Sequence, residues 1–260
     1  MRIQSLVILY LLAGTISSGV FAQSVSVNRY KDWLLGDPVY LVKNFRGDEV
    51  AGVFYSGVTI AMISAFDEQV SDDLRNRYYG SGILKVVNEF GTFRYVAPAS
   101  LGLFGVSLLS DDQKFKDAAF TSFQSVLNTA LVVNTTKFIV SRARPVQNEG
   151  SRDFDFFKLG HTSFPSGHSS TAFALIVPWV VYYPTIGTYS LLLIPTGTAI
   201  ARIVEKRHWP SDVLAGALIG GYMGYTLARK HQNDAHMKSL SVIPFVLDKG
   251  AGLTLNLHFK

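Results

Sequence analysis

The sequence predicts an all-α protein, a bundle of about six core helices followed by a C-terminal β-hairpin. Six apolar stretches are each long enough for a helix, and none shows sustained alternation of apolar and polar residues. Such alternation begins only near the end of the chain. The stretches span approximately 51–66, 95–110, 117–140, 168–183, 186–204 and 212–228.

The start of the chain is expected to lie outside this bundle. Residues 1–22 have the features of a signal peptide, because Arg2 precedes an apolar segment and Ala22 fits the small-residue cleavage pattern. This pattern predicts export to the periplasm, and an uncleaved N-terminal anchor is the alternative. Residues 23–50 are expected to form a surface arm, with a short packing helix around Pro38 as the alternative.

The rest of the chain divides into a functional domain, residues 51–232, and a tail, residues 233–260. In the tail, Leu253 and Leu255 alternate with polar residues after a turn at 248–250, which predicts the hairpin. A hairpin alone is marginally stable in water, so it is expected to dock on the bundle or on a partner.

The composition narrows the chemistry. The chain has no cysteine and a net charge of +5, which excludes a disulfide framework and thiolate chemistry. It has no dense run of Lys and Arg, so no nucleic-acid partner is expected. The hydrophobic fraction of 48% and mean hydropathy of +0.23 are high for a soluble protein and low for one made wholly of long spans. A bilayer span needs about 20 apolar residues, so membrane-spanning, partly embedded and soluble bundles all stay open.

A first chemical motif lies at the end of the third apolar stretch. Lys137 and Arg144 are seven residues apart, close to two helical turns, so both cations are predicted on one helix face, with Pro145 ending the helix. Lys137 has apolar neighbours on both sides, and a cation in such surroundings needs an anion. An exposed basic helix end is the alternative for Arg144.

A second motif directly precedes the fourth apolar stretch. Ser166 is a natural N-cap, and Gly167 lets backbone N–H groups approach a ligand. Because a helix N-terminus favours anions, His168 is predicted to act as a proton donor to a bound anion. A plain capped helix start is the alternative.

A third motif stands in a predicted helix–turn–helix. Asp212 follows His208 by four residues and is expected to accept the imidazole Nδ1–H, which leaves Nε2 free as nucleophile or base. Arg202 is expected to hold an anion against that nitrogen. A polar turn capped by His208 is the alternative. On the helix that follows, Gly216, Gly220 and Gly224 share one face and predict close approach by another helix.

In their order and spacing the three motifs resemble those of the type 2 phosphatidic acid phosphatase and vanadium haloperoxidase superfamily. They read Lys137-x6-Arg144-Pro145, Pro165-Ser166-Gly167-His168 and Arg202-x5-His208-x3-Asp212. Three spaced motifs are a specific signal, whereas each alone is weak. The resemblance covers residues from about 51 to 228. One departure is Ala201, where the family usually has serine, and this concerns the support of the site rather than bond making.

The resemblance implies a phosphoric ester or anhydride hydrolase. His208 would form a phosphohistidine, Asp212 would orient it, and His168 would protonate the leaving oxygen and then activate water. The residues implied to bind the phosphoryl group are Lys137, Arg144, Ser166, Gly167 and Arg202. No metal or cofactor is implied, because side chains supply the positive charge.

The apolar composition and the export signal favour a lipid substrate, such as phosphatidic acid, a polyprenyl diphosphate or a lipid A type phosphate, at a membrane surface or in the bilayer. Three alternatives stay open: a soluble nonspecific exported acid phosphatase, a vanadate-dependent haloperoxidase that binds vanadate through His208, and a non-enzymatic helical bundle. Several residues are predicted to have no part in the site, namely His161, His231, His236, His258 and Arg142. Asp153 and Asp155 have no assigned role. The oligomeric state is not predicted.

Overall fold

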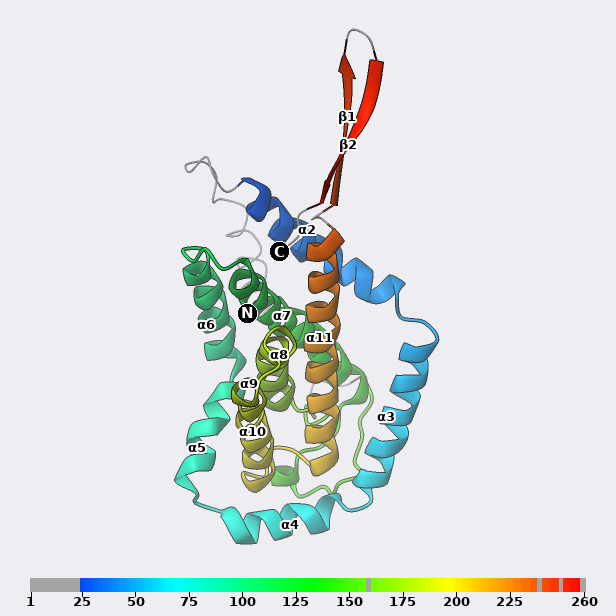
Figure 1. Ribbon diagram of the computed structural model, residues 1–260. Coiled ribbons are helices and arrows are strands. Elements are labelled where there is room, and N and C mark those ends of the chain that lie inside the picture. Colours follow the sequence, from blue (N-terminus) through cyan, green and yellow to red (C-terminus); the bar gives the residue numbers. More distant parts are fainter. Residues whose placement is uncertain (1–23, 158–159, 238–239, 248–249, 258–260) are drawn as a thin grey trace. The chain divides into compact units, whose positions relative to one another are not determined.

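The computed structural model describes residues 24–157, 160–237, 240–247 and 250–257 (Figure 1). The predicted signal peptide, residues 1–22, and His258 lie outside the described residues. The chain divides into two units, Met1–Val39 and Tyr40–Lys260, and the second contains every predicted site residue.

The helical prediction is confirmed, since each apolar stretch coincides with one helix or with two consecutive helices. The elements are α2 (Ser24–Lys43), α3 (Asp48–Ser64), α4 (Asp67–Tyr78), α5 (Gly82–Asn88), η1 (Glu89–Gly91), α6 (Phe93–Ser107), α7 (Gln113–Val140), η2 (Pro145–Gln147), α8 (Gly167–Tyr182), α9 (Ile186–Ser190), α10 (Leu193–Val204) and α11 (Pro210–Met237). The N-terminal arm is therefore largely the helix α2.

The segment 67–91, which lies between the first two predicted helical stretches, is also mostly helical. Helix α4 has no apolar periodicity that would predict it, but Asp67 and Glu68 stand in its first turn and Arg75 and Arg77 in its last. Acidic groups at the start and basic groups at the end complement the helix dipole. Charge placement rather than hydrophobic pattern is therefore the sequence signal for this helix.

Helices α7, α8 and α11 lie side by side and form the centre of the Tyr40–Lys260 unit (Figure 1). Ala118 of α7, Tyr182 of α8 and Ala228 of α11 form one buried apolar cluster. Helices α6 and α10 pack beside this centre, and α4 packs against α10 through Leu74. The second motif lies at the start of α8, and the third motif runs from the end of α10 to the start of α11. The packing of these helices brings the two motifs into one region.

The contact between α8 and α11 confirms the predicted role of the glycines. A Cβ atom on Gly216 would lie 2.4 Å from the Ser166 carbonyl oxygen, and one on Gly220 would lie 2.1 Å from that of Ser170. No side chain fits in these spaces. The backbones of the two helices therefore touch directly, and this contact fixes the start of α8 against the start of α11.

The tail differs from its predicted boundary. Helix α11 continues to Met237, five residues past the expected end of the domain at residue 232. Strands β1 (Leu240–Leu247) and β2 (Gly250–Leu257) then pair antiparallel, with Leu240 opposite Leu257 and Leu247 opposite Gly250.

The described surface is unusually apolar on some helices. Helix α3 has no buried residue, although Phe54, Tyr55 and Met62 are among its members. By length and composition alone, one described segment, Ile186–Val204, could cross a bilayer. The pair α3 and α4, bent by 66°, would add a second if it forms one span. The same criteria are met by core helices of soluble proteins.

Candidate active site

The two cations of the first motif do not share a helix face, so that part of the prediction is wrong. Helix α7 ends at Val140, because Ser141 adopts a left-handed conformation with φ 43°. Arg144 follows in extended backbone, with φ −86° and ψ 153°. The helix therefore ends four residues before the position that Pro145 suggested, and Lys137 alone projects from it.

A short loop segment nevertheless brings both cations together. Lys137 Nζ donates to the Thr162 carbonyl oxygen at 2.5 Å and lies 3.5 Å from the Ser163 carbonyl oxygen. Arg144 Nη2 donates to Thr162 Oγ1 at 3.0 Å. Neither Thr162 nor Ser163 belongs to a predicted motif, and nothing in their residue types distinguishes them from ordinary loop residues.

The second motif forms the start of α8 as predicted. The Ser166 side chain caps the helix by accepting from the Ser169 amide at 3.4 Å, and the Ser166 amide donates to the Asp212 carbonyl oxygen at 2.9 Å. A Cβ atom on Gly167 would lie 3.8 Å from Lys137 Cε, which places the cation of the first motif beside this helix start. His168 Nε2 lies 3.3 Å from Thr92 Oγ1.

The third motif departs from its prediction in one hydrogen bond. His208 Nδ1 lies 2.7 Å from the Ser163 carbonyl oxygen but 3.8 Å from Asp212 Oδ2. A carbonyl oxygen can only accept, so the proton is on Nδ1 and Nε2 keeps its lone pair. The expected free Nε2 is therefore present, but the Ser163 carbonyl rather than Asp212 accepts the Nδ1 proton.

The oxygens of Asp212 are occupied by other donors, which explains this difference. Oδ1 accepts from Arg142 Nη1 at 2.7 Å. Oδ2 accepts from Ser163 Oγ at 2.5 Å and from the Trp209 amide at 2.8 Å. Asp212 thus holds the loop that carries Ser163, and it acts on His208 as a nearby negative charge.

Arg142 was predicted to have no part in the site, but the structure gives it a supporting position. Its side chain is 2% exposed, and its Nη2 pairs with Asp67 Oδ2 at 2.6 Å. The same guanidinium donates to Ser211 Oγ at 2.8 Å and to the Ser151 carbonyl oxygen. We call Arg142, Asp67, Ser211 and Asp212 the Arg142 network. It joins the start of α4 to the start of α11.

The remaining cations have unused donors. Arg202 Nη1 lies 3.3 Å from Asn88 Oδ1 and 3.1 Å from Glu205 Oε2. Its Nε atom and that of Arg144 are buried and have no hydrogen-bond partner among the described residues. We call Lys137, Arg144, His168, Arg202 and His208 the cation–imidazole cluster.

Electrostatics within the cluster favour neutral imidazoles and a readily deprotonated lysine. Burial, followed by the charge of Arg144, lowers the pKa of Lys137 to about 7. Burial and then the charges of Arg202, Lys137 and Arg144 lower the pKa of His168 to about 3. Burial also lowers the pKa of His208 to about 3, against the opposing effect of Asp212. His208 is therefore neutral, as a nucleophile must be, at neutral pH.

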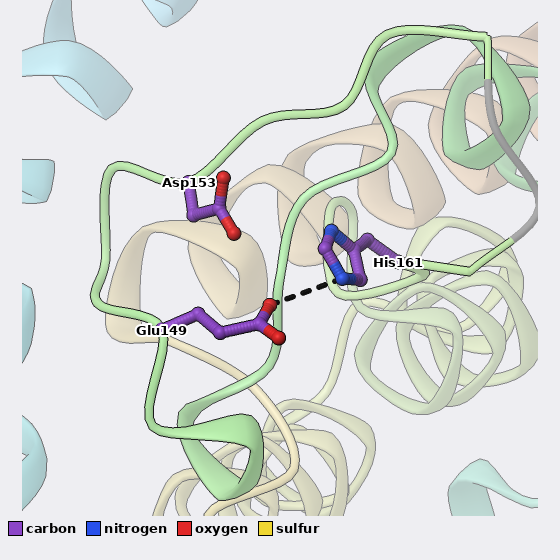
Figure 2. Close-up of side chains that lie close together, drawn as sticks. All are labelled: Glu149, Asp153 and His161. Carbon is purple, nitrogen blue, oxygen red and sulfur yellow. Dashed lines mark ion pairs between the residues drawn. The ribbon is translucent and has the colours of Figure 1, made fainter.

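A second group of titratable residues lies on the loop before Thr162. Glu149, Asp153 and His161 offer ligand atoms that all lie within 4.8 Å of one another, and Figure 2 shows their side chains turned toward a common point. His161 Nε2 pairs with Glu149 Oε2 at 3.0 Å, and Nδ1 lies 3.6 Å from Asp155 Oδ2. Histidine and carboxylate side chains could hold a metal ion. The same contacts are equally those of a histidine that pairs with neighbouring carboxylates.

A cavity of about 560 Å³ adjoins this loop. It is lined by Ser64, Ala65, Glu68, Glu149, Gly150, Ser151, Arg152 and Asp153. No member of the cation–imidazole cluster lines it. His161, as predicted, is no part of the cluster. His231, on α11, is fully buried, and its Nδ1 lies 2.7 Å from Thr121 Oγ1 of α7.

The fold is helical, and the cluster combines three cations with two histidines, a residue type that suits acid–base and nucleophilic chemistry. Residues 118–235 match the model of the PAP2 superfamily, and this segment contains all three motifs.

Curated relatives named lipid A 1-phosphatase share part of the sequence. The Rhizobium etli protein is 29% identical over 161 residues, which are 55% of this chain and 68% of that protein. The Porphyromonas gingivalis protein is 36% identical over 103 residues, 37% of this chain and 21% of that one. The Rhizobium johnstonii protein is 28% identical over 161 residues, 55% of this chain and 65% of that one.

Among solved structures, the crystal structure of Aquifex aeolicus LpxE aligns with a TM-score of 0.47 and 21% identity. The alignment covers 63% of this chain and 95% of that one.

Proposed function

We propose that the protein hydrolyses a phosphate ester or anhydride of a lipid through a phosphohistidine intermediate. The PAP2 family and the similarity to lipid A 1-phosphatases indicate a phosphatase. The observation that carries the proposal is a pair of buried guanidinium nitrogens, Arg144 Nε and Arg202 Nε, that have no hydrogen-bond partner within the described ranges.

Unpartnered donors on buried charged groups are costly, and an anion with several acceptor oxygens removes the cost. A phosphoryl group has such oxygens. Lys137 adds a third cation whose charge is felt by both imidazoles, because it contributes to the lowered pKa of His168 and of His208. The same charges would offset the negative charge that develops in the transition state.

In the first half-reaction, the free Nε2 of His208 attacks phosphorus and a P–N bond forms. The bond to the leaving oxygen breaks, and its electron pair goes to that oxygen, which takes a proton from His168. The proton stays on His208 Nδ1, which donates it in a hydrogen bond to the Ser163 carbonyl oxygen, and the nearby Asp212 stabilises the positive ring.

In the second half-reaction, water attacks phosphorus and gives a proton to His168. The P–N bond breaks, its electron pair returns to His208, and inorganic phosphate is released. His168 must be protonated for the first step although its pKa is about 3 in the free protein. The negative charge of a bound phosphate would offset Arg202, Lys137 and Arg144, which are the groups that hold this pKa down.

Two observations support a lipid as substrate. The similar proteins are named lipid A 1-phosphatases. Large apolar side chains are exposed on α3, for example Phe54 at 66% and Met62 at 67%, and a membrane surface would cover them. We also propose export to the periplasm, a catalytic domain within 51–232, and a β-hairpin tail that is separate from the chemistry.

The test is a phosphate-release assay of the full chain in detergent. The substrates are lipid A, phosphatidic acid, a polyprenyl diphosphate and p-nitrophenyl phosphate. His208→Ala should abolish release, a loss on the order of 10³-fold or more, since no nucleophile remains. His161→Gln, a histidine outside the cluster, is the matched control and should retain release.

Release from p-nitrophenyl phosphate but from no lipid would indicate the soluble nonspecific phosphatase instead. Equal release by wild type and His208→Ala would contradict the mechanism. Bromination with peroxide after vanadate loading, without phosphate release, would indicate the haloperoxidase.

A further inference from the structure

A threonine outside all three motifs contacts the predicted acid–base residue. Thr92 Oγ1 lies 3.3 Å from His168 Nε2 and 3.3 Å from Glu89 Oε2. Thr92 stands directly after η1, at the start of α6. It lies outside the segment 118–235 that matches the family.

The backbone beside Thr92 is packed tightly on the same histidine. A Cβ atom on Gly91 would lie 2.5 Å from the His168 carbonyl oxygen and 2.8 Å from His168 Cβ. Gly91 is also buried. Since no side chain fits between the two segments, η1 is held close against the start of α8, and the backbone next to Thr92 is fixed relative to His168.

The donors and acceptors of Glu89, Thr92 and His168 determine where the protons lie. A hydroxyl has one proton to donate and lone pairs that accept, whereas an ionised carboxylate can only accept. The Thr92 proton therefore goes to Glu89, and its lone pair faces His168 Nε2. Because that lone pair accepts, the ring proton is favoured on Nε2.

We infer that Thr92 is a positioning residue for His168, and that Glu89 sets the direction of the Thr92 hydroxyl so that His168 carries its proton on Nε2. This inference rests on the proposed function for its catalytic consequence. It assigns the Nε2 proton as the one given to the leaving oxygen. The 3.3 Å separation is at the long end for an N–H···O bond, so a leaving oxygen can replace the hydroxyl.

The same segment also reaches the phosphate-binding side of the cluster. Asn88 Oδ1 lies 3.3 Å from Arg202 Nη1, and the charge of Glu89 also acts on Arg202. Residues 88–92 thus link the predicted proton donor to a predicted phosphate ligand. Lys137, Arg144 and Arg202 are the charged groups that oppose protonation of His168.

The experiment compares two esters that differ in their need for an acid. An alkyl phosphate has a poor leaving group that must be protonated, whereas p-nitrophenolate leaves without a proton. Thr92→Val should lower kcat for the alkyl ester about tenfold or more, with KM and p-nitrophenyl phosphate turnover changed less than about twofold. Thr92→Ser should restore alkyl turnover, and Glu89→Gln should lower it by a smaller factor.

Thr196→Val is the matched control, because Thr196 is an exposed threonine that bonds only to the Leu192 carbonyl of its own helix. If Thr92→Val lowers turnover of both esters equally, or of neither, the inference is wrong. An equal loss would mean that Thr92 only supports the fold.

A second measurement does not depend on activity. In ¹⁵N-histidine NMR of the full chain at neutral pH, His168 should show the Nε2–H tautomer in wild type and a mixture in Thr92→Val. An unchanged tautomer would overturn the inference. If wild type hydrolyses neither ester, the proposed function fails, and the tautomer result still decides the position of the proton.

Discussion

Arg142 and Arg144 are two residues apart, yet the structure places them in opposite situations. Arg142 is buried, and its donors are matched by Asp67, Asp212, Ser211 and a backbone carbonyl. Among the residues that the structure describes, Arg144 has one side-chain hydrogen bond, to Thr162, and its buried Nε has no partner.

The difference distinguishes a cation that supports the fold from the cations that are proposed to bind a ligand. A buried arginine with every donor satisfied has no capacity left for a substrate, so the Arg142 network supports the fold. An arginine with a buried, unsatisfied donor carries a cost that another contribution must offset, and a bound anion is such a contribution. By the same criterion Arg202 is grouped with Arg144, because its Nε is also buried and has no partner among the described residues.

The largest predicted effect is on stability, at Arg142. Arg142→Ala leaves Asp67 and Asp212 buried without a counter-charge, which should lower the free energy of unfolding by about 3–5 kcal/mol. Chemical denaturation of the full chain in detergent measures this. Arg142→Lys keeps the charge but loses the planar set of donors, so its free energy of unfolding should lie between those of wild type and Arg142→Ala. An unfolding midpoint equal to that of wild type would mean that the comparison of the two arginines is wrong.

The next effect is on catalysis, at Arg144. Arg144→Ala should lower kcat/KM about 100-fold, with a change in unfolding free energy below about 1 kcal/mol, since an unsatisfied donor is removed. Steady-state kinetics and denaturation of the same preparation give both values. The control is Arg229→Ala, an exposed arginine of α11, which should change neither. A loss of stability without a loss of activity would reverse the assignment.

A smaller effect concerns pH. The pKa of Lys137 is lowered to about 7 by burial, so Lys137 loses its charge in the free protein as the pH rises through that value. Because kcat/KM reports the free enzyme, it should fall about tenfold per pH unit above this point. Lys137→Arg keeps its positive charge over this pH range, so the fall in kcat/KM should begin at a higher pH in this variant. The comparison uses one substrate, so titration of the substrate cancels. If kcat/KM falls at the same pH in wild type and Lys137→Arg, the titration of Lys137 is not the cause of the fall.

The smallest expected effect follows removal of metal ions. The predicted site draws its positive charge from Lys137, Arg144 and Arg202, so EDTA should change kcat by less than about twofold. The group at Glu149, Asp153 and His161 is separate from these cations. Loss of activity in EDTA that is restored by a divalent ion would show that side-chain charge is not sufficient.

The sequence predicted the helices better than their ends. Apolar stretches identify α3, α6, α7, α8, α10 and α11 because hydrophobic length is a property of sequence alone. The polar helix α4 has no such pattern, and only its terminal charges indicate it. The end of α7 depends on the left-handed conformation of Ser141, and a serine gives no warning of that, whereas Pro145 gave a misleading one.

Site residues were predicted as types but not as partners. The motif spacing selected Lys137, Arg144, His168 and His208, and whether they act as proposed awaits the variants above. The acceptors for Lys137 and His208 are the backbone carbonyls of Thr162 and Ser163, and every residue has such a carbonyl, so no sequence pattern could identify them. Arg142 was predicted to have no part in the site on the assumption that the helix continues to Pro145, but the helix ends at Val140.

The seven residues from Thr162 to His168 contact Lys137, Arg144, His208 and Asp212, and they also start α8. Any exchange within this segment would disturb several groups at once. Divergence toward new substrates is therefore easiest on surfaces remote from it, such as the apolar side of α3. A change of substrate preference by design is therefore best attempted by substitutions on those surfaces. The segment 162–168 should be exchanged only as a whole.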